Sequence, residues 1–134
     1  MIAISEILKK YKLEDQEAEI QTNLADLVEK LNKIRTAYGK PMTITSGLRT
    51  KADQIRIYNQ KGITDPKKIP MGSRHLYGQA ADIGDAKKEL QQWCKDNVKI
   101  LEEAGLWCEH FDDTPTWVHF QTVPPKSGNR FFKP

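Results

Sequence analysis

Two of the three histidines in this sequence stand where a metal ligand is expected. His75 is followed seven residues later by Asp82, and the segment between them contains Gly78, Ala80 and Ala81. Small residues allow the backbone to turn tightly, so both side chains can reach one point. A lone histidine beside an aspartate is more often a surface hydrogen-bonded pair. The pair therefore indicates a metal site only if a third ligand exists.

His119 can supply that third ligand. In the run Trp117-Val118-His119-Phe120-Gln121, strand alternation places His119 on the face opposite the two apolar residues. Two neutral imidazoles and one carboxylate are a typical ligand set for catalytic zinc, which keeps a fourth position open for water and lowers its pKa to about 7. The sequence thus predicts one zinc ion held by His75, Asp82 and His119.

A hydrolytic zinc site also needs a general base close to the attacking water. If the segment around Thr114 is the turn of a β-hairpin, Glu109 lies directly across from His119 and on the same face. Glu109 is therefore the predicted base. Asp113, and Asp112 beside it, are alternatives, although turn chemistry and solubility explain loop aspartates equally well. The third histidine, His110, is expected to face the other way and to be structural.

Other residues are candidates for binding a substrate. Arg49 follows the predicted end of a strand, where a fixed guanidinium could bind a carboxylate or a developing oxyanion with two hydrogen bonds. A structural ion pair is the alternative for this arginine. Trp117 and Gln121 share the face of His119 and are predicted to contact the substrate, as is Ser73.

The elements that must position these residues can be predicted from periodicity and turn residues. Helices are expected over residues 6–12, 22–38, 50–60 and 85–105, capped by Ser5, Thr50 and Asp85 where they begin. Strands are expected over 42–46, 79–83, 106–110 and 117–123, the last two as a hairpin. Residues 63–74 and 124–134 are predicted to be irregular. The sum is one α+β domain over residues 1–134, with a small, largely antiparallel sheet packed with helices.

Composition excludes several other classes of protein. The chain has 134 residues, a hydrophobic fraction of 38% and a net charge of +3 from scattered lysines, so neither membrane insertion nor nucleic-acid binding is expected. Cys94 and Cys108 are not in a Cys-x-x-Cys pair; buried thiols are predicted, with a disulfide or a zinc ligand as the alternative. No secretory signal is recognisable, and cytoplasmic accumulation before release is expected.

Three segments resemble one known family. Residues 73–82 read S-x-H-x-x-G-x-A-x-D, which resembles the signature of the zinc D-alanyl-D-alanine peptidases. These share a fold with phage L-alanyl-D-glutamate endolysins and the hedgehog signalling domain. Ser46-Gly47-Leu48-Arg49 is similar to the family's S-G-x-R, and Trp117-Val118-His119 to its second-histidine segment. The resemblance implies a hedgehog/DD-peptidase-like fold, zinc on His75, Asp82 and His119, and carboxylate or transition-state binding by Arg49.

The resemblance also implies a function. The family cuts bonds beside D-amino acids in bacterial cell-wall peptides, so we expect a zinc peptidase acting on peptidoglycan stem peptides, either a carboxypeptidase or an endopeptidase. A monomeric phage or prophage endolysin, cytoplasmic until released to the wall, or a virion-associated enzyme is expected. One position departs from the pattern: many relatives have Asp or Glu three residues before the second histidine, where this chain has Thr116. An inactive, zinc-stabilised wall-binding module is therefore the alternative.

Overall fold

The computed structural model describes all residues from 1 to 134 and is built around one five-stranded sheet. In spatial order the strands are β1 (Ile44–Ser46), β2 (Ala80–Gly84), β4 (Trp117–Gln121), β3 (Trp107–Glu109) and β5 (Phe131–Phe132). Every neighbouring pair is antiparallel except β3 and β5, which are parallel. The predicted α+β class and the largely antiparallel sheet are confirmed.

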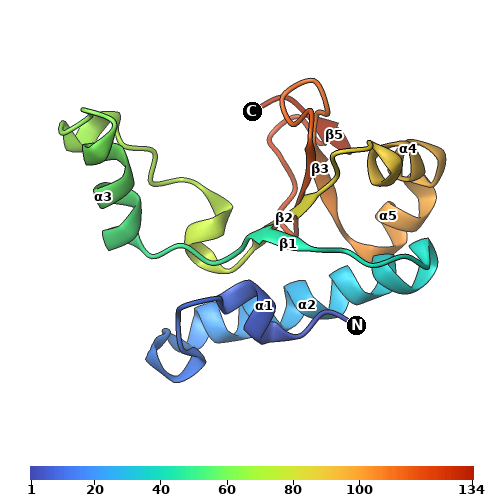
Figure 1. Cartoon of the computed structure of the whole chain (residues 1–134), viewed down its shortest axis with the longest axis horizontal. Coiled ribbons are helices and arrows are strands. Elements are labelled where there is room, and N and C mark those ends of the chain that lie inside the picture. Colours follow the sequence, from blue (N-terminus) through green and yellow to red (C-terminus); the bar gives the residue numbers. More distant parts are fainter.

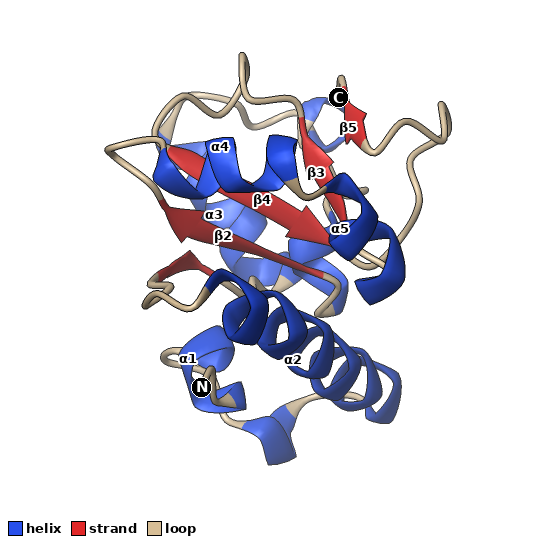
Figure 2. Ribbon diagram, turned by 90° about the vertical axis from the view of Figure 1, so that its right-hand side faces the viewer, coloured by secondary structure: helices blue, strands red, loops and turns tan.

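Helices surround this sheet on several sides (Figures 1 and 2). They are α1 (Ile4–Leu8), α2 (Ala18–Tyr38), α3 (Lys51–Gln60), α4 (Glu89–Asp96) and α5 (Val98–Ala104), with short 3-10 turns η1 (Leu13–Asp15), η2 (Pro66–Lys68) and η3 (Arg74–Tyr77). In Figure 1 the sheet stands between α4 and α5 on one side and α3 on the other, with α1 and α2 below it. None of the helices combines the length and the apolar character needed to cross a bilayer.

The long helix α2 contributes a large share of the core. Leu24, Leu27, Leu31 and Ile34 recur at helical spacing and are all fully buried. Burying one such side chain is worth about 1.5–3 kcal/mol. The helix ends as predicted at Gly39, whose positive φ of 76° lets its N–H reach the Arg35 carbonyl. It begins at Ala18, one turn earlier than the predicted start.

Two predicted helices differ from the structure. The first covers Ile4–Leu8 instead of residues 6–12, because Lys9 adopts a positive φ of 52° that ends it. The predicted helix over 85–105 is two helices, since the backbone leaves the helical conformation at Asn97. Asp85 still serves as a cap, although it lies four residues before α4: its carboxylate accepts the N–H groups of Leu90 and Gln91.

The C-terminal tail is not wholly irregular, in contrast to the prediction for residues 124–134. Phe131 and Phe132 pair with Cys108 and Glu109 and extend the sheet by one strand. A two-residue strand has no detectable alternation in the sequence, which explains why it was missed. The predicted buried thiols are confirmed: Cys94 and Cys108 are both buried and unbridged.

Gly47 lies at a close contact between the N-terminal segment and the strand that leads to Arg49. A Cβ atom on Gly47 would stand 2.2 Å from the carbonyl oxygen of Ile7. The same Ile7 carbonyl accepts the N–H of Leu48 at 2.9 Å. Only glycine allows the two backbones to approach this closely.

Gly47→Ala is therefore expected to destabilise the protein by about 2 kcal/mol, because neither backbone can move without breaking hydrogen bonds. Chemical denaturation followed by circular dichroism would measure the loss. Gly72→Ala is the control, since a Cβ there meets no atom within 4 Å. Equal stability of the two variants would contradict this account of Gly47.

Candidate metal centre

Strand pairing lines up the candidate residues in one row across the sheet. Asp82 of β2 pairs with His119 of β4, and Glu109 of β3 pairs with Phe132 of β5. In the β3–β4 hairpin, Trp107 pairs with Gln121 and Cys108 pairs with Phe120. The next position in this register sets Glu109 opposite His119, as predicted from the sequence. Directly paired residues share a face of the sheet. Val118, the neighbour of His119 in β4, points to the opposite face of the sheet and is fully buried there. The row of candidate residues therefore faces away from the core that surrounds Val118.

His75 reaches this row from the 3-10 turn η3. The turn ends at Gly78, whose positive φ of 71° allows its N–H to bond the Arg74 carbonyl and returns the chain directly into β2. The side chain of His75 is buried, at 7% exposure. Thus the glycine predicted to turn the chain between His75 and Asp82 does so, and the two residues converge.

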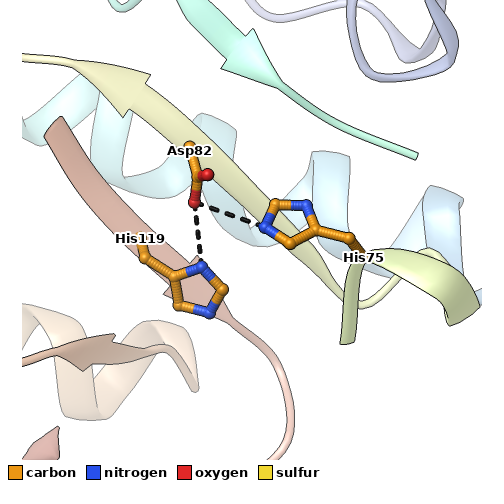
Figure 3. Close-up of side chains that lie close together, drawn as sticks. All are labelled: His75, Asp82 and His119. Carbon is orange, nitrogen blue, oxygen red and sulfur yellow. Dashed lines mark hydrogen bonds and ion pairs between the residues drawn. The ribbon is translucent and has the colours of Figure 1, made fainter. Parts of the chain in front are cut away.

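The three side chains lie close enough to hold one ion (Figure 3). The Oδ1 atom of Asp82 is 2.9 Å from Nδ1 of His119 and 3.4 Å from Nε2 of His75. All three ligand atoms lie within 4.8 Å of one another. Tetrahedral zinc with bonds of about 2.0–2.1 Å places its ligand atoms about 3.3 Å apart. Small shifts of the side chains would therefore make room for the ion.

Hydrogen bonds behind the two imidazoles decide which ring nitrogen faces the centre. Nδ1 of His75 is 2.8 Å from the Gly47 carbonyl and must donate to it, leaving Nε2 as the ligand atom. The amide of Gln121 donates to the Val123 carbonyl, so its oxygen accepts from Nε2 of His119 at 2.9 Å. Nδ1 of His119 is then the ligand atom. Such partners are typical of histidines that bind metal.

The electrostatics of the row are consistent with this arrangement. In the metal-free protein, where the ring nitrogens that would bind the metal can carry protons, burial raises the pKa of Asp82, but hydrogen bonds from His119 and His75 outweigh it and bring the pKa to about 2. Burial lowers the pKa of His119, whereas its bond to Asp82 and the charge of that carboxylate have the larger combined effect and raise it. Burial raises the pKa of Glu109 above its ordinary value. The aspartate is therefore ionised, as a metal ligand must be.

A cleft of about 770 Å³ opens beside the centre. His119, Glu109 and Gln121 lie in it. One part of the lining comes from Tyr58 of α3 together with Pro70 and Gly72–Arg74. The C-terminal tail forms another part through Pro124–Ser127 and Phe132–Pro134. The ring of Phe132 lies edge-on to His119 with centroids 6.2 Å apart. Of the three candidate ligands only His119 lines the cleft, so a peptide bound there would pass beside the metal centre.

The two predicted carboxylate bases lie in different surroundings. Glu109 is half-buried and lines the cleft. Asp113 is outside the residues that line it and pairs with Lys133 at 3.3 Å. Thr116 is exposed, and its carbonyl accepts the N–H of Asp85 at 2.8 Å. Of these three residues, only Glu109 is next to the candidate ligands.

The remaining predicted residues are divided between the cleft and other places. Ser73 and Gln121 line the cleft, whereas Trp117 does not. Gln121 also has a function that the sequence reasoning missed, the orientation of His119, although its place two residues further along the same strand face was a usable signal. His110 is outside the metal group, as expected, with its Nδ1 accepting the N–H of Asp112.

Arg49 is placed away from the cleft. Its Nη1 donates to Oε1 of the buried Gln54 at 2.9 Å, and Gln54 in turn donates to the Pro70 carbonyl. The side chain of Arg49 lines two other hollows, one beside α2 and one beside α3. The Arg49 side chain is therefore connected to the loop that forms the cleft, whereas its backbone N–H donates to the carbonyl of the candidate ligand His75 at 3.1 Å.

Comparison with known proteins agrees with this fold. A family model described as peptidase M15 matches residues 2–119. Among solved structures, the L-Ala D-Glu endopeptidase ChiX of Serratia marcescens is similar, with a TM-score of 0.53 and 20% sequence identity over 84% of this chain and 92% of that one. At this identity the likeness concerns the fold. No curated protein matches the sequence.

Proposed function

Because the chain belongs to the peptidase M15 family and is thus a peptidase, we propose that it is a zinc-dependent enzyme that hydrolyses peptidoglycan stem peptides. The observation that carries this proposal is the His75–Asp82–His119 group. In each imidazole one ring nitrogen is hydrogen-bonded outside the group, so the other nitrogen is free to bind a metal at the centre. Peptidases of this family generally depend on zinc. The donor set and its spacing suit that ion.

In the proposed reaction the metal and Glu109 have separate functions. When bound, zinc supplies a Lewis acid that makes water nucleophilic near neutral pH. We assign the general base to Glu109, beside His119, which would accept a proton from the attacking water and deliver it to the leaving amine nitrogen. The raised pKa of Glu109 suits both steps, because a carboxyl group with a higher pKa is a stronger base and is also more easily reprotonated.

The printed name of ChiX indicates which bond to test first. That protein is an L-Ala D-Glu endopeptidase, and the cleft beside the metal centre of this chain has a volume of about 770 Å³ for a peptide. We therefore propose endopeptidase action at an L-Ala–D-Glu bond. Release to the cell wall from a phage or prophage lysis system, with the protein acting as a monomer, is the corresponding biological proposal.

The experiment is digestion of muropeptides by the zinc-loaded protein, with products identified by mass. Cleavage that stops on treatment with a chelator and returns with zinc supports the proposal. The second candidate, a binding module, is favoured by Thr116 at the position where many relatives have an acid. Binding of muropeptides without any turnover by the zinc-loaded protein would establish that second candidate.

Zinc affinity is expected to fall as the pH drops below about 7. In the metal-free protein the pKa of His119 lies above its ordinary value, so a proton competes with the metal already near neutrality. Below that pKa each pH unit should weaken binding about ten-fold for one competing proton. Competition with a chromophoric chelator between pH 8 and pH 5.5 would measure this. A constant affinity across that range would contradict His119 as a ligand.

Arg49→Lys is expected to lower kcat/KM about ten-fold, on the order of 1.4 kcal/mol, while the protein still folds. Lysine keeps the charge but lacks the planar fork, so it cannot keep the single hydrogen bond to Gln54 and also bind a substrate carboxylate through two donors. Steady-state kinetics and a melting curve would be measured together. The control is Arg56→Lys, an exposed arginine on the neighbouring helix. Wild-type kinetics in Arg49→Lys would exclude a role in catalysis.

A further inference from the structure

Positive side chains predominate in the lining of the cleft. Arg74 lies in η3, and Lys126 and Lys133 lie in the C-terminal tail. Glu109 is the only acidic side chain among the lining residues. Cationic groups from two separate segments therefore surround the place where a substrate would pass. A cleft lined by one sign of charge attracts ligands of the opposite sign.

The guanidinium of Arg74 has no partner within the protein. It takes part in none of the intramolecular hydrogen bonds, ion pairs or cation–π contacts, although its side chain is half-buried. Lys133 differs, because it pairs with Asp113 at 3.3 Å and with Asp112 at 3.7 Å. The guanidinium of Arg74 is thus free to donate two parallel hydrogen bonds into the cleft, which is the geometry that fits a carboxylate.

The backbone holds Arg74 firmly beside the metal centre. Its carbonyl accepts the N–H groups of Gly78 and Gln79, and its neighbour in the chain is His75. These contacts do not use the side chain, so η3 should persist when the guanidinium is removed. Arg49, which the sequence suggested for carboxylate binding, is bonded to Gln54 outside this cleft.

We propose that Arg74, assisted by Lys126, binds a free carboxylate of the peptide substrate and thereby selects acidic stem peptides over amidated ones. The identity of the substrate rests on the proposed function. A stem peptide containing D-glutamate carries such a carboxylate next to the L-Ala–D-Glu bond, and a second carboxylate can follow further along the peptide. Amidation of either group removes the charge while nearly keeping its shape, which provides matched ligands.

The test measures binding separately from cleavage. Titration calorimetry would use zinc-loaded protein carrying Glu109→Gln, with three peptides: one with both carboxylates free, one amidated at glutamate and one amidated at the later residue. Intact peptide would be verified by mass after each titration. The expected result is about ten-fold weaker binding of one amidated peptide, and the peptide affected identifies which carboxylate Arg74 contacts.

The variants assign this preference to residues. Adding Arg74→Gln should reduce the ten-fold preference to less than two-fold, and Lys126→Gln should reduce it partly. Lys67→Gln is the control: it removes the same charge from an exposed loop residue outside the cleft and should change nothing. Should Arg74→Gln fold poorly, as judged by zinc content and melting, Arg74→Lys replaces it and should retain a reduced preference.

Two outcomes would overturn the proposal: equal binding of all three peptides, or a preference that survives Arg74→Gln in folded protein. Failure of the proposed function would look different. If wild-type protein cleaves no muropeptide but the carboxylate preference exists and depends on Arg74, the binding inference stands alone. Cleavage of free and amidated peptides at equal rates, with equal affinities, would support the peptidase and reject the role of Arg74.

Discussion

His119→Ala is expected to remove zinc from the protein and to lower kcat/KM by about a thousand-fold or more. The change deletes one of the three ligands, and the Lewis acid supplies several kcal/mol of transition-state stabilisation. Metal analysis after dialysis and muropeptide digestion would measure the two losses. The remaining pair, His75 and Asp82, leaves too few protein ligands for a stable catalytic site.

The chain offers a matched control for this substitution. His110 is also close to the β3–β4 hairpin but lies outside the metal group and is partly exposed. His110→Ala should therefore keep one zinc per chain and most of the activity. If His119→Ala bound zinc as tightly as the wild type, the assignment of the metal centre would be wrong.

Glu109→Gln is expected to lower kcat by about 10²–10⁴ while the zinc content stays unchanged, because the amide keeps the shape of the side chain but cannot accept the proton. Single-turnover kinetics and metal analysis on the same preparation would separate the two effects. Glu109 is next to His119 in the hairpin register, so the substitution tests the carboxylate beside that ligand.

Asp113→Asn is the control for the general base. Asp113 pairs with Lys133 and lies outside the cleft, so this substitution should change kcat less than three-fold. If Asp113→Asn were inactive and Glu109→Gln active, the general base would be Asp113 in the loop. Wild-type protein without any turnover would instead favour the binding module.

Much of the site could be predicted because its residues follow local rules. Strand alternation alone places His119 opposite Val118, and the position of Thr114 at the turn fixes Glu109 across from His119. Gly78 permits the turn between His75 and Asp82. Each of these inferences depends on residues close in sequence, for which backbone geometry leaves few alternatives.

The features that were missed depend on contacts between distant segments. The Gly47 carbonyl that orients His75 is 28 residues away in the sequence, and no periodicity marks it. The pairing of β5 with β3 brings the tail back to the cleft, and Gln54 joins the Arg49 side chain to the loop at Pro70. Such contacts depend on tertiary packing, which cannot be predicted from the pattern of residues in a single sequence.

The contact between Gly47 and Ile7 has a thermodynamic consequence for the metal. Leu48 donates to the Ile7 carbonyl of α1, and the Gly47 carbonyl accepts from His75. The single peptide group between Gly47 and Leu48 thus connects the N-terminal helix to a ligand ring. A metal ion that binds only when His75 is correctly oriented also stabilises the contacts that orient this ring. The first helix and the metal centre therefore form one cooperative unit, and local opening of α1 should be rarer in the holoprotein than in the apoprotein.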